Sequence, residues 1–113
     1  GIRRADILVD PGIGFGKTTR HNLEILAYVG LYRATGCGVL LGVSRKRFIG
    51  ELAGGDPTDR LAGSLAAGLA GLDAGADMLR VHDVAETVQA VRVAQAVAGV
   101  VGSARRNEPW DRR

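Results

Sequence analysis

Three polar clusters hold the residues of this sequence that are best suited to chemistry. They are VDPGIGFGKTT (residues 9–19), SRKRFIG (residues 44–50) and RVHDV (residues 80–84), and each follows or ends an apolar run. The carboxylate of Asp10 can accept paired N–H bonds from the planar edge of a guanine-type ring. Arg and His side chains can bind phosphate. The clusters together indicate a site for a phosphorylated, nitrogen-rich small molecule, with Phe15 as an aromatic neighbour.

The first cluster imitates a phosphate-binding loop without meeting its requirements. A P-loop, G-x-x-x-x-G-K-[ST], would need glycine at position 11, where this chain has Pro11, which lacks an N–H group. The dinucleotide fingerprint G-x-G-x-x-G also fails, because residue 17 is Lys. A nucleotide hydrolase is therefore disfavoured. The residues alone leave two roles open for Asp10, which could bind a heterocycle or only stabilise its loop.

The second cluster places three cations, Arg45, Lys46 and Arg47, directly after Ser44. Three adjacent cations repel one another unless an anion binds or acidic side chains lie between them, so an anionic ligand is one interpretation. A solvated charge run is the other. The run lies between an apolar segment and the pair Phe48 and Ile49, which weakens the second interpretation.

The third cluster contains Arg80 and His82. A two-residue strand period puts both on one face, with Val81 on the other. This arrangement predicts a phosphate clamp, although a histidine packed in the core is the alternative. His21 lies among polar residues and receives no role.

These clusters need elements that bring them together. Apolar runs at 5–10, 38–44 and 76–83 predict strands, and helical patterns fill the intervals and follow the last run. The helical stripes run from Leu23 to Leu31, from Leu61 to Leu72 and onward from Val84. The order β-α-β-α-β-α predicts parallel strands whose carboxyl ends share one edge. We expect an α/β fold that is part of a TIM barrel. Because a whole barrel needs eight such units, the chain is expected to be a fragment.

Composition narrows the class of protein. The 113 residues are 46% hydrophobic and 24% charged, which is typical of one soluble globular unit. One cysteine, Cys37, excludes an intrachain disulfide and fits a reducing, cytoplasmic location. No uninterrupted apolar run of membrane length is present, so no membrane is expected. The basic residues are dispersed apart from the C-terminal ones, so no nucleic-acid partner is expected despite a net charge of +3. We divide the chain into a barrel portion, 1–101, and a polar basic tail, 102–113, expected to be disordered.

Together the motifs resemble the C-terminal part of dihydropteroate synthase. LVDPGIGFGKTTRHNLEIL, LLGVSRKRFIG and RLAGSLAAGLAGLDAGADMLRVHDVAETVQAVRV are similar to that family's last three βα units, about strands 6 to 8 with their helices. The resemblance implies a transferase of folate biosynthesis that joins 6-hydroxymethyl-7,8-dihydropterin diphosphate to p-aminobenzoate and releases pyrophosphate. It also implies a Mg²⁺ cofactor, sensitivity to sulfonamides and a homodimer in the intact enzyme.

The resemblance also implies roles for particular residues. Asp10, Lys46 and Arg80 match pterin-binding positions, and Arg80 and His82 match the positions that hold the diphosphate. The p-aminobenzoate pocket would involve the following three residues: Phe15, Ser44 and Arg47. No residue is implied as a covalent nucleophile, and no metal ligand is expected in this chain.

Two departures from the family pattern limit what the resemblance implies. Many members have Ser where this chain has Arg47, so that side chain could bind the aminobenzoate carboxylate or point away. The family's first five strands, with the Mg²⁺ ligand, have no counterpart here. We therefore expect the chain to need a complementary N-terminal barrel half and to be inactive without it. A non-catalytic pterin-binding relative or half-barrel fragment is the alternative.

Overall fold

Three parallel strands form the centre of the molecule. The computed structural model describes residues 1–56 and 58–106. The strands are β1 (Leu8–Val9), β2 (Gly38–Leu41) and β3 (Met78–Leu79), in the spatial order β1-β2-β3. Both neighbouring pairs are parallel, with Leu8 opposite Gly38 and Leu40 opposite Met78. The predicted parallel α/β topology is confirmed.

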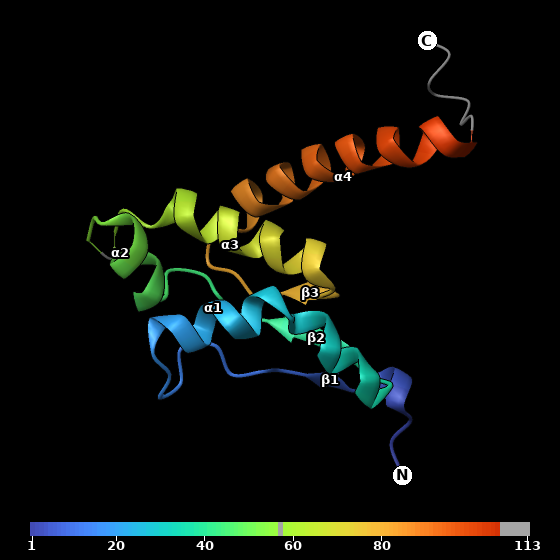
Figure 1. The fold of residues 1–113 in the computed structure, drawn as a ribbon, viewed down its shortest axis with the longest axis horizontal. Coiled ribbons are helices and arrows are strands. Elements are labelled where there is room, and N and C mark those ends of the chain that lie inside the picture. Colours follow the sequence, from blue (N-terminus) through green and yellow to red (C-terminus); the bar gives the residue numbers. More distant parts are fainter. Residues whose placement is uncertain (57, 107–113) are drawn as a thin grey trace.

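Helices connect and follow the strands. Their bounds are η1 Arg4–Asp6, α1 Thr19–Ala27, η2 Val29–Thr35, α2 Arg47–Ala53, α3 Leu61–Ala74 and α4 Val84–Arg106. Thr18 begins α1 as its N-cap, because its hydroxyl oxygen accepts a hydrogen bond from the backbone N–H of His21 at 3.1 Å. Figure 1 shows α3 between α1 and α4, with α2 beside the N-terminal half of α3.

The helical stripe predicted from Leu23 to Leu31 divides into two elements. Helix α1 ends at Ala27, and the 3-10 helix η2 carries the chain onward from Val29. The cause is a tertiary contact, because a Cβ on Gly30 would lie 2.5 Å from the carbonyl oxygen of Ala74 at the end of α3. The backbone approaches α3 closely at this point. One continuous α-helix from Leu23 to Leu31 is therefore not formed.

Helix α4 is longer than a glycine at position 99 would suggest, because glycine commonly ends helices. It continues through Gly99 to Arg106. The Ala and Val residues on either side sustain the helix, since one internal glycine costs only about 1 kcal/mol relative to alanine. The first five residues of the expected tail, 102–106, therefore have helical backbone. The rest of that tail lies outside the described residues.

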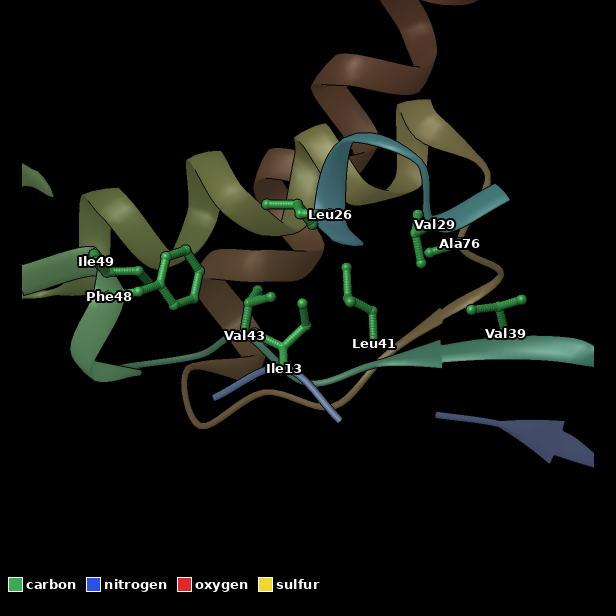
Figure 2. Packing of buried hydrophobic residues seen from close by; sticks show 9 residues of the cluster. All are labelled: Ile13, Leu26, Val29, Val39, Leu41, Val43, Phe48, Ile49 and Ala76. Atoms are coloured by element: carbon green, nitrogen blue, oxygen red, sulfur yellow. The ribbon is translucent and has the colours of Figure 1, made fainter. Parts of the chain in front are cut away.

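The core lies between β2 and the helices that cover it. Figure 2 shows Val39, Leu41 and Val43 along β2 and its extension, facing side chains from α1, η2, α2 and the loop after β1. The nine buried members are Ile13, Leu26, Val29, Val39, Leu41, Val43, Phe48, Ile49 and Ala76. Helix α3 approaches β2 so closely that a Cβ on Gly71 would lie 2.1 Å from Cδ2 of Leu41. This packing anchors the strand whose carboxyl end carries the second polar cluster.

The two outer strands present open edges. Among the described residues each pairs with β2 alone, and Leu8 and Met78 are about half exposed. An unpaired edge with exposed apolar side chains is a template for another strand. The sheet therefore has the form of a segment that further strands would complete.

Helix α4 is long and apolar enough to cross a membrane by length and composition alone. The window is Val84–Val101, and none of it is buried. It contains Glu86 and Arg92, and a charged residue such as Arg at the centre of a bilayer costs about 2.5–3.5 kcal/mol. Helix α4 also contacts α3. A single helix of this kind is weak support for a membrane span.

Candidate functional site

The ends of the first and third strands are joined by an ion pair. A guanidinium N–H of Arg80 donates to Asp10 Oδ2 at 3.0 Å, while Asp10 Oδ1 accepts from the backbone N–H of Gly12 at 2.8 Å. Gly42, directly after β2, makes room for the guanidinium of Arg80. A Cβ there would lie 3.2 Å from Nη2 of Arg80. Asp10 therefore both shapes its own loop and faces a cation from the third strand.

The ends of the second and third strands are joined through Ser44. This buried hydroxyl oxygen lies 2.9 Å from Nδ1 of His82 and accepts a hydrogen bond from the backbone N–H of His82 at 3.2 Å. The contact fixes the position of the imidazole ring. It leaves Nε2 as the ring nitrogen available for a ligand.

A small pocket lies between these contacts. Its volume is about 120 Å³, and it is lined by Gly42, Ser44, Lys46, Arg80, Val81 and His82. The strand β3 ends at Leu79, before the alternation predicted for residues 80–82. Val81 lines the same pocket as its two neighbours. Arg80 and His82 both reach this one pocket, which is compatible with the predicted shared face.

Lys46 lines a second, larger pocket as well. That pocket has a volume of about 680 Å³ and is lined mainly by the loop after β1 and by the start of α2. Phe15, Lys46 and Arg47 are among its lining residues, whereas Ser44 lines the smaller pocket. The ammonium group of Lys46 donates to the carbonyl of Ile13 and lies 5.0 Å from the ring centre of Phe15. Lys46 is thus the residue common to both pockets.

The charge of Lys46 is less favoured than in water. Burial lowers the pKa of the Lys46 ammonium group, the carboxylate of Asp10 opposes this change, and the nearby cations Arg80 and Lys17 reinforce it. The same interactions place Asp10, Lys46 and Arg80 within one electrostatic neighbourhood. A bound anion would favour the charged form of Lys46.

The flanking cations of the second cluster are already paired. Arg45 contacts Asp83 at 2.9 Å, and Arg47 contacts Glu51 at 3.2 Å. Acids therefore intervene among the three successive cations, and an anion is not needed to relieve their repulsion. A solvated charge run, the alternative given for this cluster, fits Arg47, whose side chain is 89% exposed, better than it fits Lys46.

The glycine loop does not present a phosphate cradle. Lys17 folds back and donates to the carbonyl of Gly12 at 2.7 Å, so its charge is used within its own loop. Gly12, Gly14 and Gly16 all have positive φ, between 63° and 86°. At Gly14 a Cβ would also lie 3.0 Å from Cδ of Lys46. These glycines let the loop close over Lys46.

Sequence reasoning missed several residues that organise the site. The buried Asn22 accepts a hydrogen bond from the backbone N–H of Gly14 at 2.9 Å and so ties the loop to α1. The hydroxyl of Ser64 on α3 accepts from the backbone N–H of Arg45 at 2.8 Å. An isolated Asn or Ser within a helical pattern gives no signal of such a contact. Asp83 could have been noticed as an acid one residue after His82.

The Mg²⁺ that the family resemblance implies would need a group of oxygen ligands, carboxylates among them. Within residues 1–56 and 58–106, no group of three or more His, Cys, Asp or Glu side chains could hold a metal ion. The carboxylate of Asp10 is engaged by Arg80 and Gly12, and that of Glu51, which lines the larger pocket, pairs with Arg47. The described residues do not fit Mg²⁺, and none of them has a role in binding it.

The fold is an α/β unit whose strand ends carry a cluster of charged side chains, and comparison with known proteins gives the family. Residues 1–82 match the family described as pterin binding enzyme. The chain is 41% identical over 111 residues to dihydropteroate synthase of Escherichia coli K12, covering 98% of this chain and 38% of that protein. It is 42% identical over 100 residues to inactive dihydropteroate synthase 2 of Mycobacterium tuberculosis H37Rv, covering 88% and 31%. The chain therefore belongs to the pterin-binding enzyme family.

Solved structures agree with this assignment. Dihydropteroate synthase from Stenotrophomonas maltophilia superposes with a TM-score of 0.84 at 46% identity, over 88% of this chain and 38% of that one. The Xanthomonas albilineans enzyme in complex with 7,8-dihydropteroate gives 0.78 at 53% identity, over 80% and 35%. The same enzyme with 4-aminobenzoic acid also gives 0.78 at 53% identity, over 80% and 34%. The three-stranded α/β unit is thus part of a TIM barrel of the dihydropteroate synthase type.

Proposed function

We propose that the chain supplies the strand-end residues of a dihydropteroate synthase, which condenses 6-hydroxymethyl-7,8-dihydropterin diphosphate with p-aminobenzoate. The convergence of Asp10, Lys46, Arg80 and His82 around the ends of three parallel strands carries the proposal. Membership of the pterin-binding family supports it. Because the chain spans about 38% of the length of its Escherichia coli relative, the complete activity requires the rest of a barrel.

The pterin ring is assigned to Asp10, Lys46 and Arg80. The Asp10 carboxylate can accept two N–H bonds from the amino-pyrimidine edge of the ring. Its Oδ2 accepts a hydrogen bond from Arg80, so binding would share or replace that contact. Lys46, which donates to a backbone carbonyl here, would redirect its N–H groups to the ring. Existing polar contacts would therefore be exchanged for contacts to the ligand.

The diphosphate is assigned to Arg80 and His82. During reaction, the bond between the pterin methylene carbon and the diphosphate oxygen breaks, and the electron pair leaves with pyrophosphate. The amine nitrogen of p-aminobenzoate forms the new C–N bond and then loses a proton. Arg80 and His82 would stabilise the negative charge that develops on the leaving group. No covalent intermediate with the protein is needed.

The second substrate is assigned to the larger pocket. Phe15 can pack against the aromatic ring, and Lys46 connects this pocket to the pterin position. Arg47 lines the same pocket and could meet the carboxylate once it is released from Glu51. Ser44 is assigned to the support of His82, because its hydroxyl is buried against that ring. Solved relatives that bind 4-aminobenzoic acid and 7,8-dihydropteroate support both substrate assignments.

A complementary polypeptide is the expected partner. No strand within residues 1–56 and 58–106 pairs with the outer edge of β1 or of β3, as a barrel segment would leave them. We propose that a segment with five further βα units pairs with both edges and supplies the Mg²⁺ ligand. The homodimer, the sulfonamide sensitivity and the cytoplasmic location implied by the family extend the same proposal.

A non-catalytic role is the second candidate. The relative named inactive dihydropteroate synthase 2 is as similar to this chain as the synthase from Escherichia coli. A protein of this kind would retain the pterin site without forming product. The two candidates differ in turnover and agree in pterin binding.

Reconstitution with a complementary segment tests the proposal. The chain is co-expressed with the first five βα units of the Escherichia coli synthase, and the complex is assayed for ligand binding and dihydropteroate formation. Binding with product supports the synthase, and binding without product supports the second candidate. His82→Ala should reduce turnover, and Arg20→Ala, which removes an exposed ion pair on α1, should not. A complex that binds no pterin diphosphate would refute both candidates.

A further inference from the structure

The loops that follow β2 and β3 keep the register of the strands. In the sheet, Leu40 pairs with Met78 and Leu41 with Leu79. Beyond the strands, two side-chain contacts continue with the same separation of 38 positions, first Ser44 with His82 and then Arg45 with Asp83. Side chains therefore take over the pairing where backbone hydrogen bonds stop. The loops that carry Lys46 and His82 are joined to each other.

The outer contact is a two-pronged ion pair. Arg45 donates through Nη2 to Asp83 Oδ1 at 2.9 Å and through Nε to Oδ2 at 3.3 Å. The Asp83 side chain is 20% exposed, so water reaches it only in part. The hydrogen bonds from Arg45 lower the pKa of Asp83, which stays ionised at neutral pH. A fork-to-carboxylate contact fixes orientation as well as distance.

The backbone of Arg45 is held in an uncommon conformation. Its φ is 58°, in the left-handed region that side chains other than glycine seldom adopt. Its N–H donates to Ser64 at 2.8 Å, and its carbonyl accepts from Arg60 at 3.1 Å. Three independent contacts thus determine the conformation, and such strained residues persist where the surroundings over-determine them. The turn at Arg45 sets the direction in which the next residue, Lys46, enters the site.

Neither member of the pair reaches the ligand pockets. Lys46 and His82 line the smaller pocket, but their neighbours Arg45 and Asp83 line neither of the two pockets. We propose that Arg45 and Asp83 are positioning residues, whose ion pair holds Lys46 and His82 at the spacing that pterin diphosphate requires. This inference rests on the proposed function of the site and adds residues that act only through their neighbours.

Three variants separate positioning from simple support of the fold. Asp83→Asn keeps the shape of the side chain and removes its charge. Arg45→Gly removes the fork and relieves the left-handed strain, so it is not expected to unfold the loop. The double variant tests whether the two residues act as one unit. Arg20→Ala is the matched control, because it removes an exposed ion pair, 2.8 Å long, that touches neither pocket.

The first measurement needs no substrate. Competitive labelling of the full chain with acetic anhydride across pH gives the pKa of Lys46, which burial lowers. The charged groups that face Lys46 are Asp10, Arg80 and Lys17, and all three are unchanged in the variants. Asp83→Asn removes a negative charge, which by electrostatics alone would lower the pKa of Lys46 further. Loss of positioning would expose Lys46 and raise its pKa, so the two explanations predict opposite signs.

The second measurement uses the reconstituted complex. A misplacement of about 1 Å can reduce a rate by on the order of 100-fold. We expect each single variant to weaken binding or turnover of pterin diphosphate by about 10- to 100-fold, and the double variant to be no worse than either. The proposal is overturned if the pKa of Lys46 falls or stays constant in Asp83→Asn, or already equals that of the denatured chain. It is also overturned if the fold-loss of binding or turnover in the double variant equals the product of the fold-losses in the two single variants. A complex that binds no ligand refutes the proposed function, whereas the labelling result stands by itself.

Discussion

Replacing Asp10 with Asn should separate ligand binding from stability. Asp10 is partly exposed, and its carboxylate contacts Arg80 at 3.0 Å and the N–H of Gly12 at 2.8 Å. A solvent-accessible ion pair contributes only about 0–1 kcal/mol to stability. Asn keeps an oxygen that can accept from Gly12. We therefore expect the free energy of unfolding to fall by no more than about 1 kcal/mol.

Ligand binding should fall much further. A hydrogen bond to a charged group contributes about 1.5–3 kcal/mol, which corresponds to a loss of about 10- to 150-fold in affinity. Calorimetric titration of the reconstituted complex with 6-hydroxymethyl-7,8-dihydropterin diphosphate measures this loss, and urea denaturation measures the stability. The reasoning is refuted if affinity is unchanged, or if the variant loses several kcal/mol of stability and binding falls only because the protein unfolds.

A matched control exists in the same chain. Asp56 also accepts from the backbone N–H two residues ahead, that of Thr58, at 2.9 Å. The printed hydrogen bonds of its side chain go to Thr58, whereas the Asp10 carboxylate holds Arg80, which lines the smaller pocket. Asp56→Asn thus makes the same chemical change in the same kind of turn, and it should leave affinity for the pterin unchanged.

Three further predictions concern other parts of the structure. Gly71→Ala should lower the free energy of unfolding by about 1–3 kcal/mol in urea denaturation, because the new Cβ would meet Leu41; unchanged stability would contradict the packing of α3 on β2. The pKa of Lys46, followed by competitive labelling, should be lower in the folded than in the denatured chain. Since the unfolded state then binds the proton more tightly, this group's contribution makes stability rise as pH increases from the folded pKa to the unfolded pKa, and a fall would refute it. Glu51→Gln should release Arg47 and raise the affinity of the complex for p-aminobenzoate by about 1.4- to 5-fold, because exposed pairs contribute about 0.2–1 kcal/mol; weaker binding would show that Arg47 does not meet the carboxylate.

The parallel topology could be predicted because it depends on local patterns. Apolar runs ended by charged residues placed all three strands, and the helical stripe from Leu61 to Leu72 placed α3. The division of the first helix could not be predicted, since it follows from the approach of Gly30 to the backbone of Ala74. The continuation of α4 past Gly99 reflects the weak penalty for one glycine in a long helix. Local propensity gives elements, whereas their ends depend on neighbours distant in sequence.

The candidate site, like the fold, could be predicted only in part from the sequence. Parallel strand order alone brings Asp10, Lys46 and Arg80 to one edge of the sheet, and their residue types indicate the ligand. Which acid pairs with which cation depends on the register of the neighbouring strands, and that register cannot be read from the sequence. For this reason the contact between Arg45 and Asp83 and the hydrogen bond between Ser44 and His82 were not foreseen. The cluster of three cations looked like an anion site because the acids that pair with it lie 4 and 38 positions away.

Contacts between a bound pterin and the three strand ends would test the central claim most directly. The complex of this chain with a complementary barrel segment can be labelled with ¹³C and ¹⁵N in this chain only and titrated with 6-hydroxymethyl-7,8-dihydropterin diphosphate. Isotope-edited nuclear Overhauser spectra then report which side chains touch the ligand. We predict contacts from the pterin ring to Lys46 and to the residues beside Asp10, and from the methylene diphosphate end to His82. A ligand that binds tightly while touching only one of the three strand ends would contradict a shared site.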